Sequence, residues 1–263
     1  MSDRVTITVT DGIADVRLNR PEKLNALDGE MFAAVGEAAR TVGADPSVRV
    51  VVLSGEGRGF CAGIDLDMFT APGGVGGIVS EPAPGERNRG QQASLGWHDC
   101  PVPVIAAVHG AAIGGGFQIA LGADIRIASP DAKLGLREAY WGIFPDMGGT
   151  QLLTRLVRHD IARELIYTAR IVSGEEGFAL GLVTRLSDDP RGAAMQLAAE
   201  IADNNPDAIR AAKRLLNQVL APGLDEGLEG ERREVGKLLG SSNQSESILA
   251  RVEKRKPRFT DGR

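Results

Sequence analysis

Two glycine-containing segments constrain the fold of this chain more than any other feature. The first spans residues 60–66, and the second spans residues 109–118 and includes three consecutive glycines. Each comes after a short apolar run, residues 48–53 and residues 102–108, that is typical of a buried strand. Turns made of small residues leave main-chain N–H groups uncovered, and such donors can stabilise negative charge on an oxygen atom. The two segments therefore predict a pocket lined by backbone amides, although each of them could simply turn the chain.

Alternating strands and helices are predicted around these segments. Apolar and polar residues alternate over residues 5–9 and 14–18, which predicts two strands joined by a turn at residues 11–12. Apolar residues then recur with helical spacing over residues 31–42, after Asp28, a residue type that often caps a helix. Since the strand–strand–helix unit occurs more than once, the element pattern predicts a solenoid without a visible residue-level repeat.

The last part of the chain has a helical and more polar pattern. We therefore predict two regions, a core over residues 1–190 and a helical oligomerisation region over residues 191–263. Within the second region, Pro206 is expected in the first turn of a helix with an apolar stripe. A solvated helical appendage is the alternative. Residues 71–90 contain nine glycine or proline residues, which predicts either a mobile wall of the pocket or a disordered loop.

Composition excludes several classes of function. The formal net charge is −5 and aromatic residues make up only 4% of the chain, which argues against binding to nucleic acid. The chain has no apolar run long enough to cross a membrane and no clustered metal ligands. Its two cysteines, Cys61 and Cys100, do not suggest a disulfide framework. We expect a cytoplasmic protein that contacts neither membranes nor nucleic acid.

Two carboxylates are candidates for acid–base chemistry. Glu138 lies at the end of a predicted strand, and Asp146 follows eight residues later. Both could instead serve the structure alone, because Glu138 could pair with the adjacent Arg137 on the surface and Asp146 could cap a helix. His109 fits better as a hydrogen-bonded core residue, and no Gly-x-Ser-x-Gly nucleophile motif is present.

Taken together, the motifs resemble those of the crotonase superfamily, the enoyl-CoA hydratase/isomerase family. The resemblance extends over nearly the whole chain and its motifs occur in the family's order. The matching segments are residues 18–27, 60–66, 113–116, 145–150 and 252–256.

This resemblance implies an α/β fold, a crotonase-type spiral of strand–strand–helix repeats with a helical C-terminal trimerisation region. It implies a homotrimer or a hexamer that acts on an acyl-CoA thioester and needs no cofactor, since coenzyme A is part of the substrate. The carbonyl oxygen of the thioester would be held by the amides of Ala62 and Gly115. Lys254 and Lys256 would reach the CoA phosphates of a neighbouring subunit. The residues implied in substrate or CoA binding are Lys23, Leu24, Ala26, Ala62, Gly63, Ile64, Asp65, Leu66 and Gly114.

One departure from the family's pattern bears on the reaction. Hydratases of this family use two glutamates, and this chain has Gln118 at the first position and Glu138 at the second. A glutamine side chain cannot exchange a proton as a carboxylate does, so the water-activating pair is incomplete. Glu138 and Asp146 partly match the dienoyl-CoA isomerase branch, which has an aspartate where this chain has Gln118.

We therefore predict an isomerase that shifts a double bond in an unsaturated acyl-CoA. The predicted catalytic residues are Glu138, Asp146 and Gln118. The alternatives are a hydratase that works with one glutamate, another crotonase reaction such as decarboxylation or thioester hydrolysis, and a non-catalytic acyl-CoA-binding protein.

Overall fold

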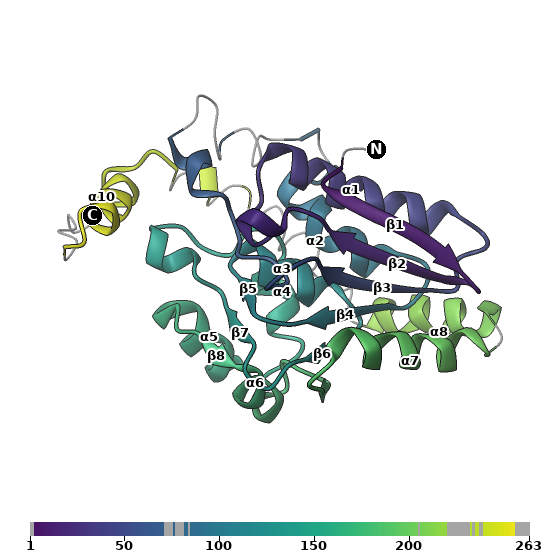
Figure 1. The fold of residues 1–263 in the computed structure, drawn as a ribbon. Helices are drawn as coiled ribbons and strands as arrows, with labels where there is room; N and C mark the ends of the chain where they lie inside the picture. The colour runs from purple at the N-terminus through teal and green to yellow at the C-terminus, as the bar shows by residue number, and fades with distance from the viewer. Residues whose placement is uncertain are drawn as a thin grey trace.

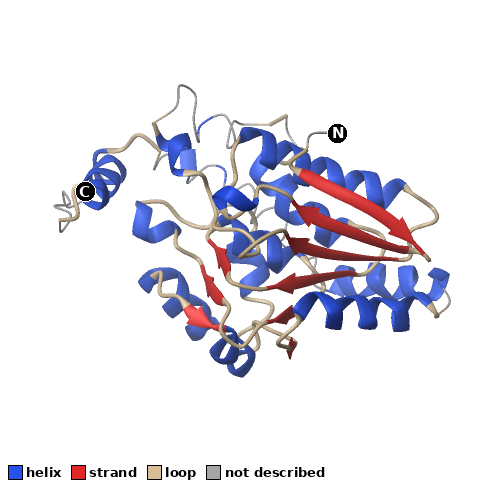
Figure 2. Ribbon diagram, in the orientation of Figure 1, coloured by secondary structure: helices blue, strands red, loops and turns tan. Residues whose placement is uncertain are grey.

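The computed structural model describes residues 3–70, 76, 82–83, 85–204, 206–219, 232, 235–236 and 239–255. A six-stranded sheet with the order β1–β2–β3–β4–β6–β9 forms its centre (Figures 1 and 2). The first two strands are antiparallel, and all later neighbours in this sheet are parallel. The strands are β1 (Val5–Thr10), β2 (Ile13–Leu18), β3 (Val50–Gly55), β4 (Val104–Val108), β6 (Ile125–Ala128) and β9 (Arg185–Leu186).

The first hairpin forms where the alternation of residues predicts it. Val5 pairs with Leu18 and Thr10 pairs with Ile13, so residues 11 and 12 make a two-residue turn. Asp11 and Gly12 both have positive φ values, 52° and 81°, as the tight hairpin turn requires.

A second, smaller sheet has the order β5–β7–β8. Its strands are β5 (Ala111–Ile113), β7 (Lys133–Gly135) and β8 (Val172–Ser173), and β5 and β7 run parallel. The short strand β5 follows β4 after two residues, so the chain passes from the large sheet to the small sheet at the second glycine-containing segment. This change of sheet brings that segment to the place where the two sheets meet.

Helices cover both faces of the large sheet. Helices α1 (Gly29–Ala44), α2 (Arg89–Asp99) and α3 (Gly115–Gly122) pack against one another on one face, over the main hydrophobic core. Asp28 caps α1 as predicted, because its side chain accepts a hydrogen bond from the Met31 N–H at 2.8 Å. The remaining helices are α4 (Gly149–Leu153), α5 (His159–Thr168), α6 (Gly174–Leu180), α7 (Pro190–Ala202), α8 (Pro206–Val219) and α10 (Ser242–Val252), with short 3₁₀ helices η1 (Pro21–Lys23), η2 (Leu66–Phe69) and η4 (Glu138–Trp141).

Helix α7 corrects the predicted boundary between core and C-terminal region. It packs on the second face of the large sheet through Ala194, Ala198 and Ala202, which form a separate apolar cluster with residues of β3, β4 and β6. The boundary placed between residues 190 and 191 therefore falls in the first turn of a helix that belongs to the core. The alanine spacing is compatible with burial, but only the position of the sheet shows what covers it.

Helix α8 docks through a buried charged residue, while Leu216 of its apolar stripe is exposed. Lys213 is buried, and its Nζ donates to the carbonyl oxygens of Trp97 and Val102 at 3.2 and 3.0 Å and lies 2.7 Å from Asp124 Oδ2. Leu216, a member of the predicted stripe, is 67% exposed. The buried ammonium group is thus held by three oxygen atoms, as a charge in the interior must be.

Several sequence predictions fall on residues outside the described part of the chain. These include most of residues 71–84, the segment 221–231 and Lys256. Within the described residues, the structure contains no helix that is both long and apolar enough to cross a membrane.

Candidate active site

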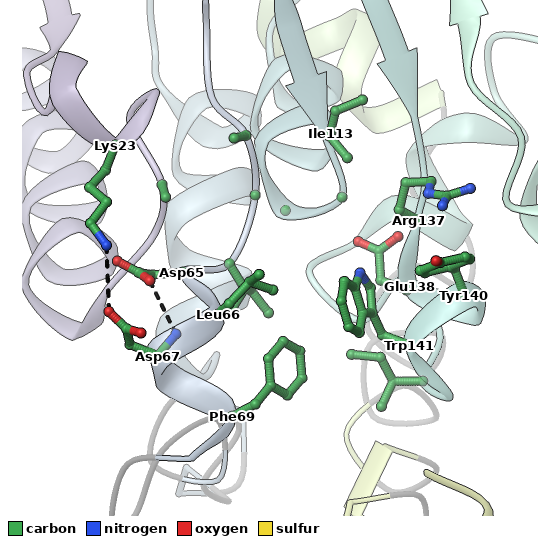
Figure 3. A pocket seen from close by; sticks show the side chains of 17 residues that line it. Lys23, Asp65, Leu66, Asp67, Phe69, Ile113, Arg137, Glu138, Tyr140 and Trp141 are labelled. Atoms are coloured by element: carbon green, nitrogen blue, oxygen red, sulfur yellow. Dashed lines mark hydrogen bonds and ion pairs between the residues drawn. The ribbon is translucent and has the colours of Figure 1, made fainter. Parts of the chain in front are cut away.

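A cavity of about 550 Å³ lies where the two glycine-containing segments meet (Figure 3). Its walls come from η1, from the chain between β3 and η2, from the start of α3 and from η4. Ten of the residues predicted from the sequence line this cavity: Lys23, Ala26, Ala62, Gly63, Ile64, Asp65, Leu66, Gly114, Gly115 and Glu138. Leu24, Gln118 and Asp146 do not line it.

The two glycine-containing segments are held together by strand-like pairing. Cys61 N–H donates to Ala111 O at 2.8 Å, and Ile113 N–H donates to Cys61 O at 3.0 Å. Gly63 has a φ of 92°, and a Cβ atom at this position would lie only 2.6 Å from Ile113 O. A side chain would therefore be strained there both by the backbone conformation and by the neighbouring carbonyl. Glycine is required for the two segments to approach this closely.

The hydrogen bonds of the first segment correct one of the two predicted oxyanion donors. Ala62 N–H is not available, because it donates to Leu24 O at 2.9 Å. Asp65 N–H is also used, by Leu27 O at 3.0 Å. Within the described residues, Ile64 N–H has no hydrogen-bond acceptor, and Ile64 lines the cavity. Ile64, and not Ala62, therefore provides a free amide of this segment at the cavity.

The second predicted donor, Gly115, lies where the sequence places it. It is the first residue of α3, and the first N–H groups of a helix have no acceptor within the helix. The preceding residue, Gly114, has a φ of 54° and donates its own N–H to Gly135 O at 2.7 Å. The Gly115 N–H thus combines a free donor with the positive end of the helix dipole.

Glu138 is a buried acid of the cavity whose side chain has an amide partner. It begins η4, it is only 5% exposed, and its Oε1 accepts a hydrogen bond from Gln118 Nε2 at 2.7 Å. Its other oxygen, Oε2, is buried and has no partner within the described residues. Burial raises the pKa of Glu138 to about 7, and the nearby Asp146 charge adds to this effect, while hydrogen bonds from its own backbone N–H and from Gln118 oppose it. A carboxyl group with such a pKa can take up and release a proton near neutral pH.

Gln118 holds Glu138 in place without reaching the cavity itself. Its Oε1 accepts hydrogen bonds from the backbone N–H groups of Met147 and Gly149 at 2.9 and 3.0 Å. These two donors determine which end of the amide is the oxygen, so the NH₂ group must point at Glu138. The geometry therefore gives Gln118 the role of a donor that positions the acid.

Asp146 is buried close to Glu138 but does not cap a helix. The N-terminal cap of α4 is Gly148, with no side-chain hydrogen bond, so the alternative that Asp146 caps a helix is wrong. Burial raises the pKa of Asp146 to about 7, and a hydrogen bond from its own backbone N–H opposes the shift. The charge of Asp146 in turn contributes to the raised pKa of Glu138.

The remaining polar residues of the cavity are paired. Asp65 Oδ2 lies 2.6 Å from Arg20 Nη1, and Lys23 Nζ lies 3.5 Å from Asp67 Oδ2 (Figure 3 shows the second pair). Glu138 thus differs from the other carboxylates of the cavity, since Asp65 and Asp67 each have a cationic partner.

The other candidates from the sequence have structural roles. His109 Nε2 lies 2.9 Å from Gly57 O, away from the cavity, and it is hydrogen-bonded as predicted but only partly buried. Burial raises the pKa of the Cys61 thiol to about 12, so this group stays protonated. No cluster of three metal-ligating side chains occurs in the part of the chain that the structure describes.

Sequence reasoning missed the aromatic side of the cavity. Phe69, Tyr140 and Trp141 line it together with Ile113 and Ile143. The chain contains only two tryptophans, and Trp141 lies three residues after Glu138, which is a signal that the sequence did offer.

Comparisons with known proteins agree with this geometry. The family model described as "Enoyl-CoA hydratase/isomerase" matches residues 8–262. A "Probable enoyl-CoA hydratase" of Bacillus subtilis is 35% identical over 97% of this chain and 98% of its own length. "Methylglutaconyl-CoA hydratase, mitochondrial" of Mus musculus is 35% identical over 94% of this chain and 79% of its own length. A crystal structure of an enoyl-CoA hydratase from Mycobacterium avium subsp. paratuberculosis superposes with a TM-score of 0.84 at 28% identity, covering 98% of this chain and 99% of that one. The predicted crotonase-type fold is confirmed by this agreement.

Proposed function

The chain belongs to the enoyl-CoA hydratase/isomerase family, and we propose that it shifts a double bond in an unsaturated acyl-CoA through an oxyanion-stabilised dienolate. The observation that carries this proposal is the Gln118–Glu138 hydrogen bond of 2.7 Å. It puts an amide where a water-activating pair needs a second carboxylate, and it leaves Glu138 as the one unpaired acid of the cavity among the described residues.

The oxyanion is stabilised by the amides of Ile64 and Gly115. Both residues line the cavity, and neither N–H has an acceptor within the described residues. When a proton leaves the acyl chain next to the thioester, negative charge accumulates on the carbonyl oxygen. Two free donors in the lining of one cavity, with the N-terminus of α3 behind one of them, stabilise that charge. Loss of one such donor typically costs roughly 2.7–4 kcal/mol in the transition state.

The proton is moved by Glu138. Its unpartnered Oε2 accepts the proton from one carbon of the acyl chain, and the same carboxyl group returns it to another carbon. A raised pKa suits this task, because the group must hold the proton between the two half-reactions. Gln118 keeps the carboxyl group oriented throughout, and Asp146 tunes its proton affinity. Asp146 does not line the cavity, so its position does not support the prediction that it exchanges a proton with the substrate.

Hydration of an enoyl-CoA by Glu138 alone is the second candidate. The relatives described above bear the name hydratase, and this favours it. The geometry argues against efficient hydration, because the amide of Gln118 donates to Glu138 and cannot share in the activation of a water molecule.

A panel of unsaturated acyl-CoAs tests the proposal. Purified protein should convert 3-enoyl-CoA or 3,5-dienoyl-CoA to the conjugated isomer, with little addition of water to crotonyl-CoA. Mass spectrometry separates the two reactions, because only hydration adds the mass of water. Brisk hydration of crotonyl-CoA without any isomerisation would rule out the preferred reaction in favour of the second candidate. Absence of turnover with every thioester, despite binding, would indicate a protein that only binds acyl-CoA.

The variant Gln118→Glu sharpens this test. In a hydratase it completes the glutamate pair and raises the hydration rate. In the proposed isomerase it lowers the rate, because a second carboxyl group 2.7 Å from Glu138 must share a proton with it. Gln151→Glu, at a partly buried position in the middle of α4 and outside the Glu138 hydrogen bonds, serves as the control for added charge.

Assembly and location remain predictions of the family resemblance. We expect a homotrimer or a hexamer, which size-exclusion chromatography with light scattering checks directly. We also expect a cytoplasmic protein that needs no group beyond the CoA thioester for its reaction.

A further inference from the structure

We propose that Phe69 and Trp141 form a gate that limits the acyl group of the substrate to a short chain. This inference rests on the proposed function, because it assumes that a CoA thioester occupies the cavity. We call Phe69 and Trp141 together the aromatic gate.

The two rings of the aromatic gate join opposite walls of the cavity. Phe69 comes from the end of η2 and Trp141 from the end of η4, and both residues line the cavity (Figure 3). Their ring centroids are 5.7 Å apart and their planes are inclined by 25°, which is a stacked arrangement. Aromatic pairs at this separation attract one another. An acyl chain that extends past this point must separate the rings.

The position of the gate relative to Glu138 makes it an end wall for the acyl group. In Figure 3, Lys23 lies on one side of the cavity, and Glu138 and Trp141 lie on the other. The free amides of Ile64 and Gly115 hold the thioester carbonyl, so the chain atoms that Glu138 serves lie beyond the carbonyl on the Glu138 side. Trp141 is only three residues from Glu138 along η4, so the tail of the acyl group reaches the gate soon after the reacting carbons.

The gate is braced from outside by a stack of charged and aromatic groups. The Tyr140 ring lies edge-on against Trp141, with centroids 5.3 Å apart and planes at 83°. The guanidinium groups of Arg137 and Arg251 lie over the Tyr140 ring, at 4.0 and 3.7 Å from its centroid. Arg251 belongs to α10, so the C-terminal helix contributes to the position of the wall. Each cation–ring contact of this kind is attractive, and two on one ring fix it firmly.

The gate is not simply part of the hydrophobic core. Among the described residues, the core clusters and the side chains packed against them include neither Phe69 nor Trp141. Both side chains are partly exposed, while the other tryptophan, Trp97, is completely buried. Because the two rings line the cavity and stack on each other outside the core, they define the shape of the cavity.

Binding of saturated acyl-CoAs tests the gate without depending on the reaction. Isothermal titration calorimetry gives the Kd of free CoA, butyryl-CoA, octanoyl-CoA and dodecanoyl-CoA for the full-length protein. We expect dodecanoyl-CoA to bind at least about tenfold more weakly than butyryl-CoA, equivalent to about 1.4 kcal/mol. Trp141→Ala and Phe69→Ala should each remove this difference, whereas Trp141→Phe, which keeps a ring at the gate, should retain it. Free CoA ends before the gate and should bind all four proteins equally.

Each outcome distinguishes the gate from the proposed function. If the wild-type protein binds free CoA and all chain lengths equally, the gate is wrong and the proposed function stands. The gate is also wrong if both alanine variants bind free CoA normally and still bind butyryl-CoA more tightly than dodecanoyl-CoA. If both variants lose affinity for free CoA, the two rings have a structural role and the gate is wrong as well. If no CoA compound binds to the wild-type protein, the proposed function fails and the gate fails with it.

Discussion

Two buried carboxylates face the same cavity from opposite sides, and their pKa values are shifted in opposite directions. Asp65 is 6% exposed and Glu138 is 5% exposed, so burial alone does not distinguish them. Burial raises the pKa of Asp65, but hydrogen bonds from Arg20 and from the Asp67 N–H outweigh it, and the net pKa is lowered. Glu138 has an amide donor and a neighbouring carboxylate, and its pKa is raised to about 7. The difference shows that cationic and backbone donors can outweigh burial at Asp65, whereas burial prevails at Glu138, which has no cationic partner.

The largest expected effect is on turnover. Glu138→Gln should lower kcat by about 10²–10⁴-fold, because it removes the group that exchanges the proton while preserving shape. Asp65→Asn is the matched amide substitution on the other side and should change kcat by less than about tenfold, since Asp65 only holds Arg20 and the start of η2. Steady-state kinetics on the isomerised substrate, with Kd measured in parallel, separates chemistry from binding. If Glu138→Gln and Asp65→Asn lower kcat equally, the different roles assigned to the two carboxylates are wrong.

A smaller effect is expected on stability when Arg20 is removed. Arg20→Ala leaves Asp65 buried without its cation, which should lower the free energy of unfolding by roughly 3 kcal/mol at neutral pH. The folded-state pKa of Asp65 is lowered from 3.8, so its contribution to stability is present above that value and is lost as the pH falls. The variant should therefore lose less stability on acidification than the wild type. Urea unfolding at neutral and acidic pH measures both quantities, and Lys23→Ala, which removes an exposed partner of Asp67, is the control.

If the free energy of unfolding falls equally on acidification in the wild type and in Arg20→Ala, Arg20 does not set the ionisation of Asp65.

The smallest effect is a pair of opposite shifts in the pH dependence of kcat/KM. As a base, Glu138 must be ionised in the free enzyme, so the rate should rise with pH through about 7. Asp146→Asn removes a negative neighbour and should shift the rise of kcat/KM to lower pH. Gln118→Leu removes a hydrogen bond to the Glu138 carboxylate and should shift the rise of kcat/KM to higher pH. The folded-state pKa of Glu138 is raised from 4.5, so its contribution to stability is present below 4.5 and is lost as the pH rises through about 7.

Asp67→Asn, on the opposite side of the cavity, should leave the pH at which kcat/KM rises unchanged. Shifts of the same sign in Asp146→Asn and Gln118→Leu would mean that the rise of kcat/KM with pH does not report the ionisation of Glu138.

Local patterns predicted several of the elements, and the family resemblance implied most of the residues that line the cavity. The hairpin at residues 11–12, the cap at Asp28 and the strands before both glycine-containing segments depend on interactions between near neighbours in the chain. The motifs also predicted Glu138 and Gly115, because a residue after a strand or at the start of a helix has a position that follows from the element.

Three features depended on partners that are distant in sequence. Leu24 O occupies the Ala62 N–H, and this pairing left Ile64 as the free amide. Helix α7 packs on the large sheet, so the core extends beyond residue 190. The aromatic gate joins Phe69 to Trp141, which are rings from two different 3₁₀ helices.

The sequence by itself determined that this chain forms strand–strand–helix units, that two glycine-containing turns follow buried strands, and that an amide, Gln118, replaces one acid of the family's pair. Only the tertiary structure decided which backbone amides remain free and which carboxylate has a pKa raised to near neutral pH. The physical reason is that a free donor or a raised pKa is defined by what lies within hydrogen-bonding distance and by what excludes water. Those neighbours come together only when residues 24–27, 61–65, 115–118 and 138–149 pack around one cavity.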